Sequence, residues 1–361
     1  MAPPEDCTQP SRCCAKGDGV DRSIVFSQEC PPWEEFHQKF PDVTIFHSPR
    51  WGHVMRRAYD NEAIYVTALR GRQVVGTLTL VLQHSAILGS RLCSIPYFDT
   101  SGIVADTKEI ARQLVEAARQ LADRHGAKWA ELRQVQPLEL AMPVSARKVT
   151  FQMPLPHRSE ALWESLRAKI RNRIRKAQRQ GLLVYQGRHE MLDFFYDVYA
   201  RNMRDLGSPP HSRRFLELTM EEFYEHVRIF VVCCKKEPLA AGFTLMDRHT
   251  MHVPWAGSDW RRSETCANML LYWSMMSNAC DHRLQRFDFG RCTVGSGTYD
   301  FKHQWGGQEQ PLYWHYVLGK GRQLPDPAED NALFQRAARY WRRLPVAVST
   351  VMGPRLIAKL S

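Results

Sequence analysis

The sequence predicts an α/β protein built from two similar units, each a mixed sheet with helices packed on it. The order hairpin, loop, helix, strand occurs twice, and the second copy follows the first after about 165 residues. The chain has 361 residues and is 44% hydrophobic, which is sufficient for two buried cores. A chance similarity of two hairpins is the alternative, and the matching helix and strand that follow each hairpin count against it.

The first copy shows the alternation of apolar residues that is typical of a β-hairpin, with a turn at Gly71. Its helix carries an apolar stripe, and Asp106 and Glu109 have the spacing of a capping box. The predicted elements are strands at 64–69, 74–82 and 128–135, a loop at 94–102 and a helix at 107–125.

The second copy repeats this order. It predicts a hairpin within 227–247, a loop at 252–257, a helix at 265–280 and a strand that begins at Arg286. Between the copies, apolar residues recur every four positions from Leu162 to Ile174, which predicts one amphipathic helix at 160–181. Further helices are expected at 190–205 and 213–226.

These elements divide the chain into four segments. We expect a disordered head at 1–22, an N-terminal unit at 23–150, a C-terminal unit at 151–318 and a basic helical tail at 319–361. The head is rich in Pro, Gly and Cys.

Composition narrows the classes of function. The net charge of +11 favours acidic partners such as nucleic acid, anionic lipid or phosphate-bearing substrates. The ten cysteines are expected to be reduced thiols, and no metal site is expected because zinc-ligand spacing is missing. The sequence contains neither a secretory signal nor an apolar run long enough for an integral membrane segment. We therefore expect a cytoplasmic protein, with peripheral contact to the inner membrane as a further option.

The stretch 286–307 is the expected location of the chemistry. It begins as a strand, turns through Gly290, Gly295 and Gly297, and gathers many polar side chains beside aromatic ones. The polar residues are Asp288, Arg291, Tyr299, Asp300, Lys302 and His303. A tight loop whose aromatic residues simply belong to the core is the alternative.

Several motifs resemble the Fem-type aminoacyl- and acyltransferases, most strongly over about 160–317. These motifs are Ser48-Pro49-Arg50-Trp51, Gln180-Gly181-Leu182, the segment 199–207, Ala240-Ala241-Gly242, the segment 268–273, Phe287-Asp288-Phe289-Gly290-Arg291, Gly297-Thr298-Tyr299 and Phe301-Lys302-His303-Gln304-Trp305-Gly306. Within this FemAB-like family, the chain is most similar to the branch linked to exosortase and exopolysaccharide systems of bacteria.

The resemblance implies tandem GNAT-like domains, that is, acyl-CoA N-acyltransferase-like domains, with a cleft between them. It implies transfer of an acyl or aminoacyl group onto an amine or hydroxyl of a cell-envelope or exopolysaccharide precursor. The acceptor would be an anionic small molecule or a lipid- or nucleotide-linked glycan precursor. The donor would be acyl-CoA or aminoacyl-tRNA, with no tightly bound cofactor. The long helical hairpin that some relatives use for tRNA is not visible in this sequence, and helix 160–181 is the only candidate for it.

The resemblance also assigns roles to individual residues. It places Phe301 and Lys302 at the transfer centre, and Lys302 fits the role of a cation that stabilises the tetrahedral oxyanion. The alternative for Lys302 is a salt bridge to Asp300 or Asp288. Asp288 would accept the proton of the attacking amine, or else only hold Arg291 in place.

Other polar residues are expected to bind the substrate. Arg291 and Tyr299 would hold an anionic donor or acceptor. Asp99 is expected to line the acceptor cleft together with Asn202, Arg204 and His211. The alternative for Asp99 is a residue that only forms a turn.

Two rival functions remain open at this point. One is an acetyl-CoA-dependent N-acetyltransferase acting on a sugar or small amine, although the segment 261–268 lacks the glycines that usually hold the pyrophosphate. The other is a non-enzymatic RNA-binding protein, which would explain the charge but not the crowded stretch 286–307. The basic side of the helix predicted at 160–181 has three possible roles: it is only exposed to solvent, it binds phosphate or RNA, or it binds anionic lipid.

Overall fold

A computed structural model describes residues 22–27, 33–40, 43–71, 73–85, 89–319 and 332–360. All of the predicted head except Arg22 lies outside the described residues. The strands are β1 (Arg22–Ser27), β2 (Glu62–Arg70), β3 (Gln73–Ser85), β4 (Gly89–Ser94), β5 (Val104–Ala105), β6 (Trp129–Gln134), β7 (Val144–Pro154), β8 (Leu182–Gly187), β9 (Val227–Cys234), β10 (Glu237–Met246), β11 (Thr250–Ser258), β12 (Arg286–Thr293) and β13 (Gln308–Leu318). The α-helices are α1 (Trp33–Lys39), α2 (Arg50–Tyr59), α3 (Lys108–Arg124), α4 (Ser159–Ser165), α5 (Ala168–Arg179), α6 (Leu192–Leu206), α7 (Arg213–Glu222), α8 (Ala267–Asp281), α9 (Gly297–His303), α10 (Ala332–Trp341) and α11 (Val346–Leu360). The 3-10 helices are η1 (Ile45–His47), η2 (His189–Met191), η3 (Tyr224–His226) and η4 (Trp260–Thr265).

One mixed sheet runs through both halves of the molecule, in the order β1-β2-β3-β4-β6-β13-β7-β12-β11-β10-β9-β8. In the first half, β2, β3 and β4 are antiparallel, and β6 returns parallel to β4 after helix α3. In the second half, β9, β10 and β11 are antiparallel, and β12 returns parallel to β11 after helix α8. The predicted α/β duplication is therefore confirmed by the order of elements and by the pairing.

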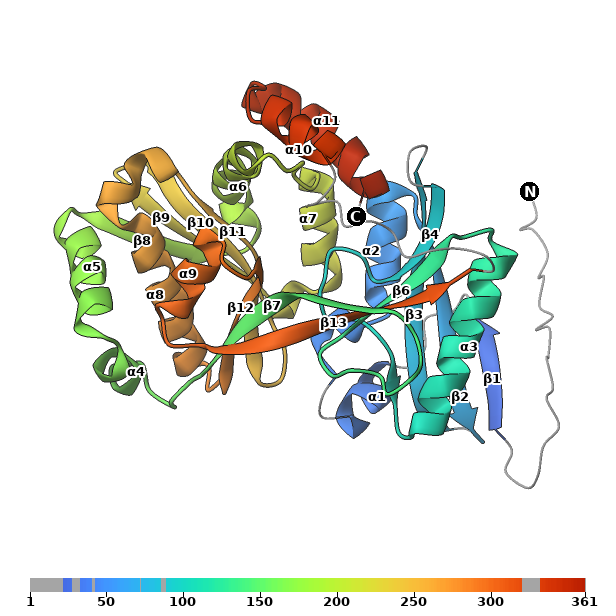
Figure 1. The fold of residues 1–361 in the computed structure, drawn as a ribbon. Helices are drawn as coiled ribbons and strands as arrows, with labels where there is room; N and C mark the ends of the chain where they lie inside the picture. The colour runs from blue at the N-terminus through green and yellow to red at the C-terminus, as the bar shows by residue number, and fades with distance from the viewer. Residues whose placement is uncertain are drawn as a thin grey trace, which may run out of the picture.

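The two halves exchange their closing strands. Strand β7 follows β6 in the chain but pairs with β12, whereas β13 follows β12 but pairs with β6. The two exchanged strands also pair with each other, and Figure 1 shows them as long ribbons that cross between the halves. A boundary between residues 150 and 151 would fall inside β7.

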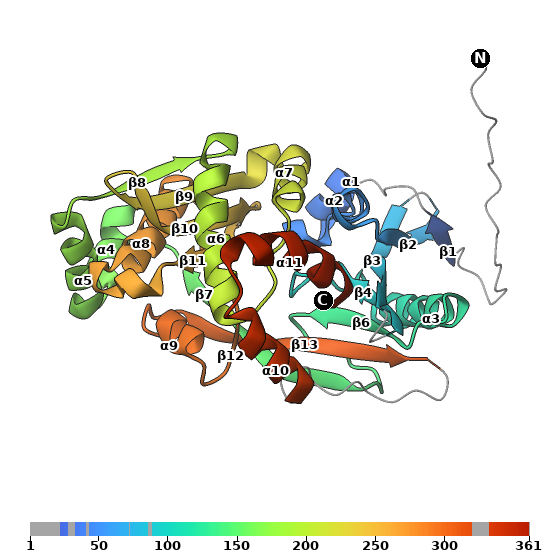
Figure 2. The same cartoon turned by 90° about the horizontal axis from the view of Figure 1, so that it is seen from above.

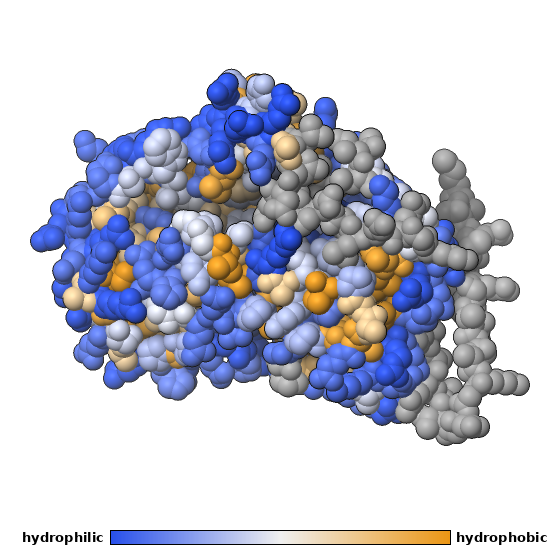
Figure 3. Space-filling model, in the orientation of Figure 1, coloured by the Kyte–Doolittle hydropathy of each residue, from blue (hydrophilic) through white to orange (hydrophobic). Residues whose placement is uncertain are grey.

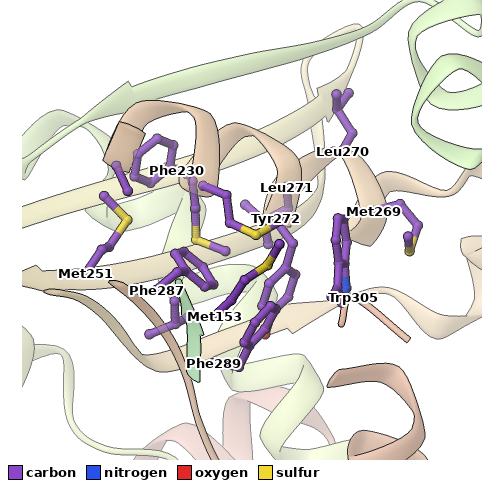
Figure 4. Packing of buried hydrophobic residues seen from close by; sticks show 14 of the residues in the cluster. Met153, Phe230, Met251, Met269, Leu270, Leu271, Tyr272, Phe287, Phe289 and Trp305 are labelled. Atoms are coloured by element: carbon purple, nitrogen blue, oxygen red, sulfur yellow. The ribbon is translucent and has the colours of Figure 1, made fainter. Parts of the chain in front are cut away.

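Each half of the sheet is covered by helices because its side chains alternate between two faces. Phe230 and Val232 of β9 belong to the core beneath α8, while Ile229 and Val231 belong to the core beneath α6 and α7. Figure 4 shows the first of these cores, in which side chains of α8 lie over those of β12. The described side chains of α3 cover the corresponding face of the first half.

A third group of contacts joins the halves. Helix α2 of the first half packs against α7 of the second. Trp51 of α2 is fully buried and donates its indole N–H to the carbonyl of Ile45 at 2.9 Å. A buried aromatic side chain of this size contributes a large apolar area to the shared core.

Several local predictions need correction. The helix predicted at 160–181 is broken at Leu166 and Arg167, which are extended, so that α4 and α5 pack separately on α8. The loop predicted at 252–257 is strand β11, and its Pro254 lies where the pairing with β10 changes register. Helix α3 is capped by the hydroxyl of Thr107 rather than by Asp106. Gly297, which the sequence places in a turn, is the first residue of helix α9.

Within the predicted tail, residues 332–360 form helices α10 and α11, which we term the α10–α11 ridge. Helix α11 contacts α6 of the second half as well as α2 and β3 of the first. Figure 2 shows the ridge lying across the junction of the two halves. The face in Figure 3 is mostly hydrophilic, and its apolar side chains gather on the side of β6 and β13. In the part of the chain that the structure describes, no helix combines the length and the apolar character needed to span a bilayer.

Candidate active site

The candidate site begins at a bulge in β12. The pairing of β12 with β7 shifts between Asp288 and Arg291, and Gly290 within the shift has a φ of +75°. A Cβ atom on Gly290 would lie 2.8 Å from the carbonyl oxygen of Val253 in β11. Only glycine fits this position without strain, and the bulge re-aims the carbonyl groups of the strand.

Lys302 lies above this bulge with its side chain buried. Its Nζ donates to the carbonyl oxygens of Gly290 at 2.5 Å and Arg291 at 2.9 Å. Burial lowers the pKa of the amine from 10.5 to about 8, against the opposing charges of nearby acidic groups, Asp288 among them. The amine is thus bonded to two carbonyls, and the alternative of a salt bridge to Asp300 or Asp288 is wrong.

Helix α9 holds Lys302 in place through its cap and its aromatic contacts. The hydroxyl of Ser296 accepts the N–H of Tyr299 at 3.2 Å and so caps the helix. Phe301 packs edge-on against Tyr272 of α8 with ring centroids 4.9 Å apart, next to Trp305. Figure 4 shows Tyr272 and Trp305 in the same core as Phe289. The contacts of Phe301 therefore anchor α9 to the core, and its catalytic role stays a prediction.

Asp288 is buried and surrounded by donors. Its Oδ1 accepts from the hydroxyl of Thr150 at 2.5 Å and from the N–H of Gly290 at 2.8 Å. Its Oδ2 lies 3.4 Å from both Gln152 Nε2 and His252 Nδ1. Burial alone would raise the pKa of Asp288, but its hydrogen bond and attraction to His252 and the bonds from Thr150 and Gly290 lower it. Asp288 therefore holds the bulge, and the alternative in which it holds the Arg291 side chain is wrong.

His252 and Asp247 form a buried polar pair that the sequence reasoning missed. His252 Nε2 lies 2.8 Å from Asp247 Oδ2, and His252 bridges Asp247 to Asp288. Burial alone would lower the pKa of His252, but the charge of Asp247 and the hydrogen bonds raise it from 6.5 to about 9. The sequence does contain a signal for this pair, because Asp247 and His252 lie on either side of the start of β11. The signal is hidden when residues 252–257 are interpreted as a loop.

Arg291 and Asp99 meet across the junction of the halves. Arg291 Nη1 donates to Asp99 Oδ1 at 2.7 Å, although 192 residues separate them in the chain. The guanidinium of Arg291 also lies 5.3 Å from the ring centroid of Trp314, and that of Arg133 lies 4.4 Å from the same centroid. The Arg291 side chain remains 38% exposed, so a ligand can reach it.

The other predicted site residues have different surroundings. The hydroxyl of Tyr299 donates to Glu309 of β13 at 2.6 Å. Asn202 of α6 packs against Gly257 at the far end of β11, about 13 Å along the strand from Val253. Arg204 bonds to Asp205 and to the carbonyl of Leu344, beside the tail.

His211 lies in an aromatic cluster at the junction. Its Nδ1 is 2.8 Å from the hydroxyl of Tyr59, and its ring packs against those of Tyr97, Phe215 and Trp255. Burial lowers its pKa to about 3, which keeps the ring neutral. The structure therefore brings together Lys302, Asp288, Arg291 and Asp99, while His211, Asn202 and Arg204 have other neighbours.

Two surface hollows lie elsewhere. One is lined by α4 and α8, including Trp163 and Trp273, and the other lies between η2 and β9, including Arg188 and Arg228. Among the described residues, no group of three or more His, Cys, Asp or Glu side chains could hold a metal ion. The predicted cleft between the halves at Lys302 stays a prediction.

The duplicated sheet, with one helix between the antiparallel strands and the parallel strand of each half, defines the tandem GNAT fold. Residues 164–303, from α4 to α9, match the sequence model described as an acetyltransferase (GNAT) domain. The domain contains the Gly290 bulge and Lys302. Residues 164–303 accordingly form a GNAT-type acetyltransferase domain, and the chain is an acyltransferase.

Solved structures share this fold. FemX is 14% identical, with a TM-score of 0.63, and the match covers 79% of this chain and 95% of FemX. The C-terminal domain of a putative lysylphosphatidylglycerol synthetase from Agrobacterium fabrum is 12% identical, with a TM-score of 0.50 over 85% of this chain and 92% of that one. L-PGS from Bacillus licheniformis is 11% identical, with a TM-score of 0.50 over 82% and 98%. At these identities the likeness concerns the fold alone. No curated protein matches the chain.

Proposed function

We propose that the chain transfers an acyl or aminoacyl group onto an amine or hydroxyl of a cell-envelope or exopolysaccharide precursor. The GNAT domain supports the reaction class, and the similarity of the fold to that of FemX supports a FemAB-like assignment. The observation that carries the proposal is the buried amine of Lys302, fixed by two carbonyls beside the exposed guanidinium of Arg291. The motifs described above favour the branch linked to exosortase and exopolysaccharide systems.

Lys302 supplies the charge that the reaction needs. An amine or hydroxyl that attacks an ester or thioester carbonyl forms a tetrahedral oxyanion. Collapse of this oxyanion breaks the bond to the thiolate or alkoxide of the donor, which leaves and takes up the proton that the attacking group gives up. An ammonium group has three N–H donors, and two of them are used by Gly290 and Arg291. The third is free to donate to the oxyanion, and the low dielectric around a buried group strengthens that bond. With a pKa of about 8, the amine is mostly protonated at neutral pH.

Asp288 and His252 act as positioning residues in this proposal. Against the opposing effect of burial, the pKa of Asp288 is lowered by the hydrogen bond and charge of His252 and by the bonds from Thr150 and Gly290, so its carboxylate is a weak base for the proton of the acceptor. Its bond to the Gly290 N–H fixes the bulge whose carbonyl orients Lys302. His252 keeps Asp288 charged because it carries a proton between Asp247 and Asp288.

Arg291 binds the anionic part of the substrate. Its guanidinium fork matches phosphate or carboxylate, and its present partner Asp99 is a single carboxylate at the junction of the halves. A phosphate group on a lipid- or nucleotide-linked precursor would compete with Asp99 for this guanidinium. Tyr299 is a weaker candidate for the same role because its hydroxyl is taken by Glu309.

The donor is acyl-CoA or aminoacyl-tRNA. The matched domain favours acetyl-CoA, so an acetyl-CoA-dependent N-acetyltransferase acting on a sugar or small amine is the second candidate function. The segment before α8, where GNAT enzymes usually hold pyrophosphate, forms η4 and has no glycine. The basic helix α5 is short, at Ala168–Arg179, which weakens the case for a tRNA donor. We place the reaction in the cytoplasm, close to the inner membrane where such precursors are made.

Thermal unfolding with candidate ligands tests the proposal. Acetyl-CoA, aminoacyl-tRNA and uridine-linked sugar precursors are each added to the full chain, because a ligand that binds the native state raises its melting temperature. Transfer from the donor that protects is then measured with labelled acyl groups. Protection by a donor and a precursor together with transfer supports the function, whereas protection by RNA alone without transfer contradicts it.

A further inference from the structure

Helix α11 exposes apolar side chains on its solvent face. Val351 is 68% exposed, Met352 46%, Val348 38% and Leu356 36%. These positions are three or four residues apart, so they form one stripe along the helix. An ordinary surface helix has its apolar stripe toward the core, and the stripe on α11 faces the other way.

The inner face of α11 explains this orientation. Ser349 is fully buried and Gly353 lies so close to the α6–α7 connection that a Cβ atom would come within 2.5 Å of Pro210 Cδ. Small residues thus bring the helix backbone close to the body of the protein. Ile357 is buried on this inner face, whereas the other large side chains, Val348, Val351, Met352 and Leu356, are left outside, and no described segment covers them.

The charge of the ridge has one sign. Residues 332–360 contain six basic side chains and no acidic one, and all six are exposed. The basic residues are Arg336, Arg339, Arg342, Arg343, Arg355 and Lys359. Arg355 and Lys359 project from the same face as the apolar stripe, because they follow Val351 and Met352 at helical spacing. Tyr340 of α10 is 65% exposed on the same ridge.

Helix α6 and η4 place two further exposed apolar side chains close to the α10–α11 ridge. Leu206, at the end of α6, is 55% exposed and accepts a bond from Arg342 at its carbonyl. Trp260 of η4 is 63% exposed and donates to Asp205 at 3.0 Å, one residue before Leu206. Figure 1 shows α10 and α11 standing out at the top of the molecule, where a flat surface can reach them.

We propose that the α10–α11 ridge docks on the surface of an anionic lipid bilayer. Helix α11 lies in the plane of the interface, with Val351 and Met352 among the headgroups and Arg355 and Lys359 on anionic phosphates. Exposed Trp260 and Tyr340 are residue types that prefer this interface. The helix has 15 residues and spans about 22 Å, which suits a helix that lies on the membrane.

The charge and chemistry of the ridge favour lipid over other occupants. A second copy of the chain, joined by a two-fold axis, would bring two surfaces of the same positive sign together. Nucleic acid would bind the arginines but would leave the stripe of Val348, Val351 and Met352 exposed to water. An anionic bilayer satisfies both the charge and the apolar stripe. The inference does not depend on the proposed acyl transfer, because binding is measured without turnover.

Cosedimentation with vesicles tests the proposal. The full chain is mixed with vesicles of phosphatidylcholine alone, or of phosphatidylcholine with phosphatidylglycerol. We expect binding only to the vesicles that contain phosphatidylglycerol, with weaker binding at high salt. The double variant Val351→Ser/Met352→Ser should bind at least about tenfold more weakly. The variant Arg355→Glu/Lys359→Glu should lose at least about thirtyfold, since each basic residue contributes roughly a factor of five.

Two controls separate the ridge from other basic or apolar surfaces. Lys169→Glu/Lys176→Glu on exposed positions of α5 makes the same change of charge, and Leu183→Ser removes a 53%-exposed leucine of β8. Both should bind like the parent protein, and thermal melting checks that all variants are folded. Failure of the parent protein to bind phosphatidylglycerol, or loss of binding in the α5 variant alone, overturns the proposal. So does dimerisation, seen by sedimentation velocity, that is abolished by Val351→Ser/Met352→Ser while vesicle binding stays unchanged.

Discussion

Replacement of Lys302 tests the chemistry at the Gly290 bulge. Lys302→Met keeps most of the apolar volume but removes the ammonium, and Lys302→Ala removes both. In the proposed mechanism the one N–H of Lys302 that bonds neither to Gly290 nor to Arg291 donates to the reacting oxygen, so the loss corresponds to one oxyanion donor. Deletion of one such donor costs about 3–4 kcal/mol, or about 10²–10³ in kcat. We expect both variants to fold and to lose at least about tenfold in transfer rate, a loss of about 1.4 kcal/mol or more.

The pH dependence distinguishes a cation from a base. The pKa of Lys302 is lowered from 10.5 to about 8, so the amine loses its proton above about pH 8. If Lys302 stabilises the oxyanion as a cation, kcat falls above that pH, and Lys302→Arg, which stays charged, moves the alkaline limb upward. A base at this position would instead give activity that rises toward pH 8.

The lowered pKa of Lys302 also affects stability, which should increase with pH where kcat decreases. Between about pH 8 and 10.5 the unfolded chain holds a proton that the folded chain has lost. Rising pH therefore favours the folded state in this window, by at most roughly 3 kcal/mol. Lys302→Met should lack this increase, which denaturant melts at several pH values measure.

Single-turnover transfer with a labelled donor is the assay for these variants. Lys176→Met on the exposed face of α5 is the matched control and should transfer at the parent rate. Turnover of Lys302→Met equal to that of the control would refute the reasoning. An unchanged alkaline limb in Lys302→Arg would refute the cationic role while leaving the position of Lys302 intact.

Three further changes probe the surroundings of Lys302. His252→Gln should lower the free energy of unfolding by about 3 kcal/mol or more near neutral pH, because two buried carboxylates lose their partner. In denaturant melts this loss of stability should shrink as the pH rises through about 9, since the folded protein then loses the proton of His252. A loss that does not change with pH contradicts the charged state of His252. Gly290→Ala should cost about 2 kcal/mol in the same melts and lower kcat, whereas Gly306→Ala, also at positive φ but in open space, should cost less and keep kcat. Asp99→Asn should change stability by less than about 1 kcal/mol and lower the KM for an anionic acceptor by freeing Arg291, and a raised KM would count against that role.

The sequence could predict the elements whose pattern is local. The hairpins and α8 follow from apolar alternation and spacing within short windows. The strand β11 was missed because Pro254 normally excludes a strand interior, and here a shift of register accommodates it. The break between α4 and α5 was missed because Leu166 is buried on either reading of the pattern.

The candidate site was only partly predictable, because its contacts join segments that are far apart in the chain. Lys302 was found through a short motif, but its hydrogen-bond partners depend on a backbone bulge that has no distinct residue pattern beyond one glycine. Arg291 was expected near Asp288, three residues away in the chain, yet its partner is Asp99. Contacts between residues 192 positions apart follow from the packing of the two halves, which no local window contains.

The exchanged strands β7 and β13 make the two copies of the repeat depend on each other. A chain with either copy alone would lose the strand that the other copy supplies, so β6 or β12 would be an open edge unless the copy's own closing strand paired with it. Deletion or replacement of one copy would therefore remove a paired strand from the sheet of the other. Denaturation should accordingly proceed as one cooperative event, and evolution could vary the loops around the sheet far more freely than the number of copies.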